Sequence, residues 1–309
     1  MYFVEKMRNS RHNCPEVNVM LKAIVTDMDG TLLAPGDHIL PETKQKLLEL
    51  EKQGVTLILA SGRSYTRLLP YARELELEKY GGYLIEVDGI SLYDVQAGQR
   101  EVLRRMDPSE IREVYTDLMH LNCEAQACFD DGFFFYFDED IRRRKEALRK
   151  ERNIPEDFPW TAGPWDWLAD LRSGYPNQTF VHSAEEINRP INKIQLMQDE
   201  DKIREIYDFL IRKYGDRFEI FRTCPRQLEI LPKGYSKGKT LKRLMEMTGW
   251  NKDEVVAFGD GENDVSMFEV VDDSFAMANA RDFVKAKARY ETASNADNGI
   301  VRGLERLGV

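Results

Sequence analysis

The sequence has 309 residues, of which 42% are hydrophobic and 32% are charged, and its formal net charge at pH 7 is −10. This length allows two domains of ordinary size, and the composition is typical of a soluble globular protein. The acidic balance argues against nucleic acid or an anionic membrane as partner. No apolar run approaches membrane-spanning length and no secretory segment opens the chain, so we expect a cytoplasmic protein.

The first predicted strand organises the rest of the chain. Residues 1–20 mix charge, Asn and Pro without a period, and we interpret them as an N-terminal tail. The apolar run at 23–25 then predicts a buried strand, which ends in Asp27-Met-Asp29-Gly-Thr31. A strand that ends in carboxylates fits a parallel α/β sheet, where ligands bind beyond the carboxyl ends of the strands. This pattern alone leaves open an ordinary Asp-Gly turn and a metal or phosphoryl site.

A second strand also ends in small polar residues. Residues 55–60 predict a buried strand that is followed by Ser61-Gly62-Arg63. Ser61 suits the N-cap of a helix beginning near Tyr65, and free N–H groups at such a helix start also bind phosphate. Further on, Asp88-Gly89 lies between two apolar runs and predicts a β-hairpin.

Composition shifts near residue 105, where a different pattern of elements begins. A helix is expected at 108–121, followed by strands at 123–129 and 133–137. An irregular insertion with one short helix is expected at 153–176. A strand at 193–198, a helix at 201–213 and strands at 218–221 and 227–231 complete the order. We interpret the basic run at 142–152 as a solvated helix face, because acidic residues interleave with it. This order predicts an α+β module that interrupts the α/β pattern.

The α/β pattern resumes at residue 232. Ser236 is expected to cap a helix that runs from Lys237 to Met247, with Gly249 ending it. The stretch is close to a P-loop, but only three residues separate Gly234 from Gly238, so the loop is too short to wrap a phosphate. Lys237 at a helix start suits either a phosphate cradle or a solvated surface lysine.

The last motif again places acids after a strand. Residues 255–258 predict a buried strand that ends in Gly259-Asp260-Gly-Glu-Asn263-Asp264. The predicted strand ends and the helix start that carries Lys237 meet at one edge of a parallel sheet. Several carboxylates there require a cation, and Mg²⁺ with its oxygen ligands is the usual one. Such an edge suits phosphoryl transfer, in which a carboxylate attacks the phosphate.

These motifs resemble, in the same order, the four motifs of the haloacid dehalogenase superfamily, and the surrounding phrases are similar to its Cof-type (subfamily IIB) phosphatases. The resemblance covers residues 21–309. It implies a Rossmann-like, doubly wound parallel sheet in an α/β core of residues 21–104 and 232–309. An α+β cap that determines specificity is inserted at 105–231. One departure is Asp88-Gly89, which stands where such proteins usually carry Asn-Gly.

The resemblance also implies a role for each motif residue. Asp27 is the expected nucleophile that forms an aspartyl-phosphate, and Asp29 is the expected general acid and base. The expected metal site uses the carboxylates of Asp27 and Asp260 and the backbone carbonyl of Asp29. The carboxylate of Asp264 is expected to bind the metal or to lie just behind these ligands. The expected phosphate ligands are backbone and side-chain donors, from Met28, Ser61, Gly62, Lys237 and Asn263.

The implied function is a Mg²⁺-dependent phosphatase acting on small phosphorylated metabolites. Sugar phosphates are the favoured substrates, with flavin-pathway and cofactor phosphates as rivals. The expected partner is the metabolite, with no nucleic acid or membrane. A phosphomutase on the same core and a catalytically weak phosphate-ligand-binding module remain alternatives, with a P-loop NTPase a distant third. The oligomeric state, the exact substrate and the effect of Asp88 are left open by the sequence.

Overall fold

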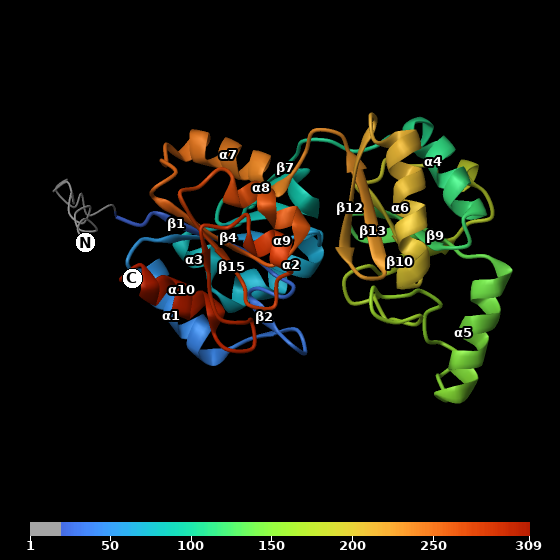
Figure 1. Ribbon diagram of the computed structural model, residues 1–309, viewed down its shortest axis with the longest axis horizontal. Helices are drawn as coiled ribbons and strands as arrows, with labels where there is room; N and C mark the ends of the chain where they lie inside the picture. The colour runs from blue at the N-terminus through green and yellow to red at the C-terminus, as the bar shows by residue number, and fades with distance from the viewer. Residues whose placement is uncertain (1–19) are drawn as a thin grey trace, which may run out of the picture.

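The computed structural model describes residues 20–309 (Figure 1). The predicted tail therefore lies outside the described residues, except for Met20. Two large sheets form the centres of two lobes that lie side by side. Both the first described residues and the C-terminus belong to the lobe of the first sheet (Figure 1).

The first sheet has eight strands in the order β16-β15-β14-β1-β4-β5-β6-β7. The strands from β16 to β5 run parallel, and β6 and β7 add antiparallel at one edge. Their bounds are β1 Ala23–Asp27, β4 Thr56–Ala60, β5 Tyr83–Glu86, β6 Ser91–Asp94, β7 Gln99–Val102, β14 Val255–Gly259, β15 Asp273–Ala276 and β16 Tyr290–Glu291. A small ribbon, β2 Leu33–Ala34 with β3 His38–Ile39, follows β1. This sheet is the parallel-rich α/β core that the sequence predicts.

Helices cover both faces of this sheet because its central strands are apolar on both sides. In β1, Ile24 packs into one buried cluster while Ala23 and Val25 pack into another. The first cluster includes residues of α1 Pro41–Lys52, α2 Tyr65–Glu74, α3 Leu77–Tyr80 and α10 Gly299–Arg306. The second includes residues of α7 Lys237–Thr248, α8 Val265–Phe268 and α9 Asp282–Lys285.

The second sheet is mixed but mainly antiparallel. Its order is β10-β9-β8-β11-β13-β12, and only β10 and β9 pair in parallel. The bounds are β8 Glu124–Phe129, β9 Gly132–Tyr136, β10 Asn177–Phe180, β11 Lys193–Met197, β12 Phe218–Cys224 and β13 Gln227–Pro232. The chain enters this sheet after β7 and returns to the first sheet after β13, so the sequence of one lobe interrupts that of the other.

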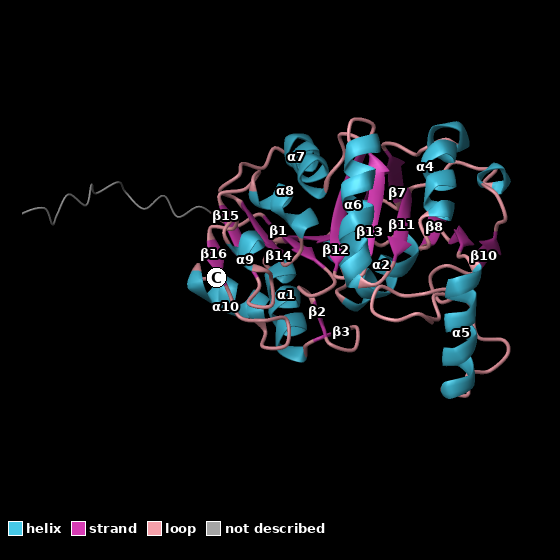
Figure 2. Ribbon diagram, turned by 45° about the vertical axis from the view of Figure 1, so that its right-hand side comes forward, coloured by secondary structure: helices cyan, strands magenta, loops and turns pink. Residues whose placement is uncertain are grey.

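Two helices, α4 Pro108–His120 and α6 Glu200–Tyr214, pack on the face of the second sheet that points away from the first sheet (Figure 1). A third helix, α5 Glu139–Glu151, extends from the far end of this lobe in both views (Figures 1 and 2). The opposite face of the second sheet is partly covered by residues 153–176, whose aromatic side chains pack with those of β9. Its remainder is turned toward the core lobe.

Two local expectations are wrong, and one strand was not predicted. Residues 153–176 contain turns and one isolated bridge but no helix. The strand β10 was not predicted, because its sequence Asn-Gln-Thr-Phe is only half-buried and lacks an apolar run. Ser61 is not the cap of α2, whose N-cap is Ser64.

The basic run at 142–152 is also not wholly solvated, because Lys145 is fully buried. Its ammonium lies 2.5 Å from Glu124 and donates to the backbone carbonyl of Trp167 at 2.9 Å. The interleaved acids indicated a surface helix, but one lysine of α5 faces the second sheet, where a buried glutamate and backbone carbonyls replace water. Among residues 20–309, none of the helices combines the length and apolar character that crossing a bilayer requires.

Candidate active site

Asp27 is the last residue of β1, whose five residues are all buried. Because β1 lies between β14 and β4, its carboxyl end lies in the middle of the sheet edge. The Asp27 side chain is therefore held in a crowded position, where the residue is only 6% exposed. A carboxylate with so little water around it requires charged or hydrogen-bonding partners.

The turn after β1 is shaped by Gly30. Its φ of +83° lies in the left-handed region, which a glycine adopts without strain. A Cβ at this position would also collide with the carboxylate of Asp260. Thr31, next in the chain, donates its hydroxyl to Asp260 Oδ1 at 2.8 Å. The β1 turn and the β14 turn are thus in direct contact, as expected for neighbouring parallel strands.

The β14 turn supplies the other two acids. Asp260 follows the end of β14, and Asp264 closes a single 3₁₀ turn, Glu262–Asp264. Asp264 is fully buried, and its Oδ2 accepts from the backbone N–H groups of Asp260 at 3.0 Å and Gly261 at 2.9 Å. These bonds fold the loop back on itself and fix where Asp260 points.

Lys237 joins the two turns. It is the first residue of α7, which is capped by the side chain of Ser236 as predicted. The buried ammonium donates to Asp27 Oδ1 at 2.6 Å and to Asp264 Oδ1 at 2.7 Å. Burial alone would lower the pKa of Lys237, but Asp264 and Asp27 outweigh it and hold the pKa well above its ordinary value. Lys237 is therefore charged, and the solvated-lysine alternative is wrong.

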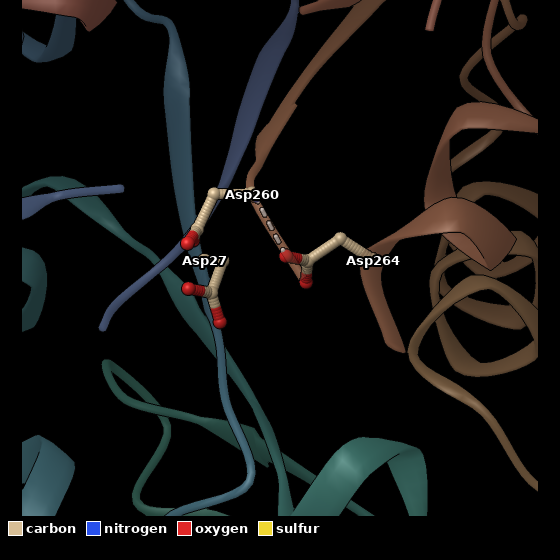
Figure 3. Close-up of side chains that lie close together, drawn as sticks. All are labelled: Asp27, Asp260 and Asp264. Atoms are coloured by element: carbon tan, nitrogen blue, oxygen red, sulfur yellow. Dashed lines mark hydrogen bonds between the residues drawn. The ribbon is translucent and has the colours of Figure 1, made fainter. Parts of the chain in front are cut away.

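Three carboxylates lie close together at the ends of β1 and β14 (Figure 3). One oxygen from each of Asp27, Asp260 and Asp264 lies within 4.8 Å of the others. Burial raises the pKa of Asp27 well above its ordinary value, and Asp264 raises it further. Burial and then Asp264 raise the pKa of Asp260 to about 7. A single ammonium leaves this cluster with excess negative charge, which a divalent cation with oxygen ligands would neutralise.

The hydrogen bonds indicate which acids are free to ligate a cation. Both oxygens of Asp264 are occupied, one by Lys237 and the other by two backbone N–H groups. Asp27 uses one oxygen for Lys237, while Asp260 accepts from Thr31 through Oδ1 and, at a longer 3.4 Å, from Asn279 through Oδ2. The donor set fits a hard cation between Asp27 and Asp260, with Asp264 holding the lysine and the loop from behind.

Asp29 does not join this cluster through its side chain. Its carboxylate is 55% exposed and pairs with Arg63, whose Nε donates to Asp29 Oδ2 at 2.8 Å and whose Nη2 contacts the other oxygen. Arg63 also reaches Asp37 at 3.4 Å. The sequence analysis quoted Arg63 within its motif without giving it a role. Its position two residues after Ser61, in the same loop at the end of β4, was the feature that could have indicated a role at the site.

The predicted phosphate ligands lie around the same edge. Ser61 is buried, and its hydroxyl accepts from the backbone N–H of Arg63 at 3.1 Å. Asn263 does not contact the acids; its amide donates to Asp88 Oδ1 at 2.7 Å. Gly62 lies under Asp88, since a Cβ there would be 2.8 Å from Asp88 Oδ2. Met28, predicted to act through its backbone, buries its side chain in the core.

Asp88 therefore lies at the site, whereas the sequence marked it only as part of a hairpin turn and as a departure from the usual Asn-Gly, with an effect left open. The strands β5 and β6 do form an antiparallel hairpin, as predicted. Its turn, Val87–Gly89, has three consecutive positive φ values and is buried rather than exposed. The Asp-Gly signal identified the turn, but it carried no information about which neighbours would cover it.

A cavity of about 320 Å³ opens beside Lys237, between the two lobes. The first lobe contributes charged and polar side chains, including Asp88, Lys237 and Asn263. Strand β12 of the second lobe contributes Glu219 and Phe221, together with Ile220. The cavity thus has a polar floor at the sheet edge and a partly apolar wall from the other lobe, a combination typical of small-molecule sites.

The comparisons with known proteins agree with this architecture. The family of haloacid dehalogenase-like hydrolases matches residues 24–304, so the chain belongs to this family, and the predicted Cof-type membership of the superfamily is confirmed. A crystal structure of a haloacid dehalogenase-like hydrolase from Bacteroides thetaiotaomicron has 25% sequence identity and a TM-score of 0.72, and the match covers 93% of this chain and 99% of that one.

Two relatives carry names that describe their substrates. A 5-amino-6-(5-phospho-D-ribitylamino)uracil phosphatase of Bacillus subtilis is 26% identical, over 93% of this chain and 98% of its own. A pyridoxal phosphate phosphatase of Escherichia coli is 27% identical, over 91% of this chain and 96% of its own. The chain is thus a hydrolase of this family, and the names of these relatives agree with the predicted class of phosphoric monoester hydrolase.

The raised pKa values predict that cation binding releases protons. A divalent cation between Asp27 and Asp260 requires both carboxylates to be ionised, yet the pKa of Asp260 is about 7 in the free protein. Titration of Mg²⁺ by calorimetry at pH 7, in two buffers of different ionisation enthalpy, should give heats that differ by the enthalpy of the protons released. The affinity should rise with pH toward about 8. Heats that are independent of the buffer would contradict this electrostatic description.

Proposed function

We propose that the protein is a Mg²⁺-dependent phosphatase that hydrolyses small phosphorylated metabolites, most of all sugar phosphates, through an aspartyl-phosphate on Asp27. One observation carries the proposal: the carboxylate of Asp27 is buried, 2.6 Å from the ammonium of Lys237, and adjoins two further acids. Water is excluded here and positive charge is already in place, as nucleophilic attack by a carboxylate on a dianionic phosphate requires.

Mg²⁺ would be held by Asp27, the Asp29 backbone carbonyl and Asp260, with Asp264 behind them, and when bound it would neutralise negative charge on the phosphoryl oxygens. The chain's own residues supply the rest. Lys237 orients Asp27 and adds a fixed positive charge. The Ser61 hydroxyl, the Gly62 and Met28 backbones and the Asn263 amide are the proposed donors to the phosphoryl oxygens.

Asp29 is the proposed general acid and base. It would protonate the leaving oxygen in the first step and take a proton from water in the second. Its side chain is 55% exposed and therefore accessible to water, which supports this role. Arg63 holds the carboxylate in the free protein, so in this role Asp29 exchanges Arg63 for the leaving-group oxygen.

Substrate choice is proposed to come from residues 105–231, which act as a cap on a core of residues 21–104 and 232–309. The core groups above contact only the phosphoryl group, which all phosphate esters share. The cavity beside them is lined by Glu219 and Phe221 of β12, a mixture of acceptor and aromatic surface that suits a polyhydroxylated leaving group. The relatives named above for ribityl and pyridoxal phosphates support small phosphorylated metabolites as the class.

The direct test is a panel of phosphorylated metabolites with and without Mg²⁺. The wild-type protein should release phosphate only with the metal, fastest from a sugar phosphate. Asp27→Asn should abolish turnover, because an amide is neither a nucleophile nor an anionic ligand. Its thermal unfolding should be measured to show that it is folded. Wild-type kcat in Asp27→Asn would refute the assignment, and isomerised sugar phosphate without free phosphate would instead identify a phosphomutase.

A second pair of variants separates the two neighbouring acids. Asp29→Asn keeps the backbone carbonyl, so cation affinity should change little while kcat falls by roughly 10²–10⁴-fold through lost proton transfer. Asp37→Asn is the matched control, because it removes the other carboxylate partner of Arg63 at 3.4 Å and should leave kcat nearly unchanged. Loss of Mg²⁺ binding with intact turnover in Asp29→Asn would reverse the assignment.

A further inference from the structure

A second buried cluster of charges connects the two lobes. It consists of Asp88 in the β5–β6 turn, Lys193 at the start of β11 and Glu229 in β13, each less than 5% exposed. The ammonium of Lys193 lies 2.7 Å from Glu229 Oε1 and 3.9 Å from Asp88 Oδ2. Two residues of the second sheet thus meet one residue of the first, out of contact with solvent.

This cluster lies directly on the proposed phosphate site. A Cβ placed on Gly62 would come 2.8 Å from Asp88 Oδ2 and 3.2 Å from Lys193 Nζ, so both groups lie against the Gly62 backbone. The other oxygen of Asp88 accepts from the amide of Asn263 at 2.7 Å. In these contacts, Lys193 is therefore the charged group of the second sheet that lies against the Gly62 turn, and its charge is positive.

The cluster is incompletely bonded as it stands. Asp88 Oδ2 and Glu229 Oε2 are buried without a hydrogen-bond partner. Burial would raise the pKa of Asp88, but Lys193 and Lys237 outweigh it and hold the pKa below its ordinary value. Burial raises the pKa of Glu229 to about 7, with Asp88 adding to the rise against Lys193. Groups that bond so incompletely contribute little net stability, because their desolvation offsets their attraction.

The other strong polar bridge between the lobes has a different character. Asp130, in the β8–β9 turn, accepts from Arg100 at 2.8 Å and from Arg105 at 2.7 Å, and its backbone carbonyl accepts from Ser64. The side chains of Asp130, Arg100 and Arg105 are partly exposed, Ser64 is buried, and none of the four is a proposed phosphate or metal ligand. This bridge holds the two lobes together away from the proposed ligands. The Lys193 contact, in contrast, forms only when the second sheet lies in one position relative to the phosphate site.

We propose that Lys193 is a positioning residue for the reaction: held by Glu229, its ammonium docks on Asp88 above the Gly62 turn and sets the closed position of the cap. This inference rests on the proposed phosphatase function. In this closed position, the cap would exclude bulk water from the space beside the phosphoryl group. It also lowers the cost of placing Asp88, an anion, beside a phosphate site, since Lys193 shares its positive charge between Asp88 and Glu229.

A double-mutant cycle on kcat/KM tests the contact. Lys193→Met should lower kcat/KM by about 10²-fold, because a misplaced cap leaves the substrate poorly aligned. Asp88→Asn alone should lower it less, and in the Lys193→Met background it should have an effect of less than about threefold, because the contact is already lost. Lys193→Arg should restore part of the activity. Independent, multiplicative effects of the two substitutions would overturn the proposal.

Lys145→Met is the matched control. Lys145 is likewise a fully buried lysine of the second lobe paired with a glutamate, but its partner Glu124 belongs to the same lobe. This variant should lower the midpoint of thermal unfolding while kcat/KM of the folded protein stays within about threefold of wild type. An equal loss of kcat/KM in Lys145→Met would show that Lys193 has only a general structural role.

Two further measurements keep the test decisive. If Lys193→Met does not fold, Lys193→Met with Glu229→Gln removes the unpaired carboxylate, and kcat/KM of that protein should remain insensitive to Asp88→Asn. If the wild-type protein hydrolyses no phosphate ester, the proposed function fails but docking is still testable. Amide hydrogen exchange at residues 87–90 should then be faster in Lys193→Met/Glu229→Gln than in wild type, and unchanged exchange would overturn the docking itself.

Discussion

The contact of the Lys237 ammonium with Asp27 and Asp264 is the interaction on which the site depends. It connects the start of α7 to the end of β1, 210 residues away in sequence, and to the turn after β14, 27 residues away. Without this buried cation, three carboxylates would share a small volume, and at least one would have to take up a proton. The lysine therefore lowers the electrostatic cost of bringing these carboxylates together in the middle of the sheet edge.

The rest of the first lobe positions the side chains at this edge of the sheet. Apolar strands buried on both faces force the polar residues of the motifs to their carboxyl ends, where side chains from β1, β4 and β14 meet. The second sheet approaches from the same side and completes the cavity with β12. This geometry supports the proposed roles of the two lobes, in which the first would hold the phosphoryl group and the second would contact the part of the substrate that varies.

The sequence was sufficient to predict this edge because strand ends in a parallel sheet converge whatever the loops do. Asp27, Asp260, Asp264 and Lys237 come together as expected, and the interrupting α+β order appears as a separate sheet. Side-chain direction was not predictable. Asp29 turns to Arg63, and Asp88 is covered by Lys193, a residue more than 100 positions away. The second pairing depends on how the two lobes face each other, and the first on how two loops of the same sheet edge meet; no local pattern records either.

Chemical trapping of the covalent intermediate tests the central claim most directly. The protein is mixed with its best substrate and Mg²⁺, quenched during turnover and treated with borohydride, which reduces an acyl phosphate to an alcohol. Because Asp27 is the proposed nucleophile, peptide mass spectrometry should find homoserine at position 27 and aspartate at position 29. Homoserine at another acid, or none at any position while phosphate is released during the same interval, would contradict nucleophilic catalysis by Asp27.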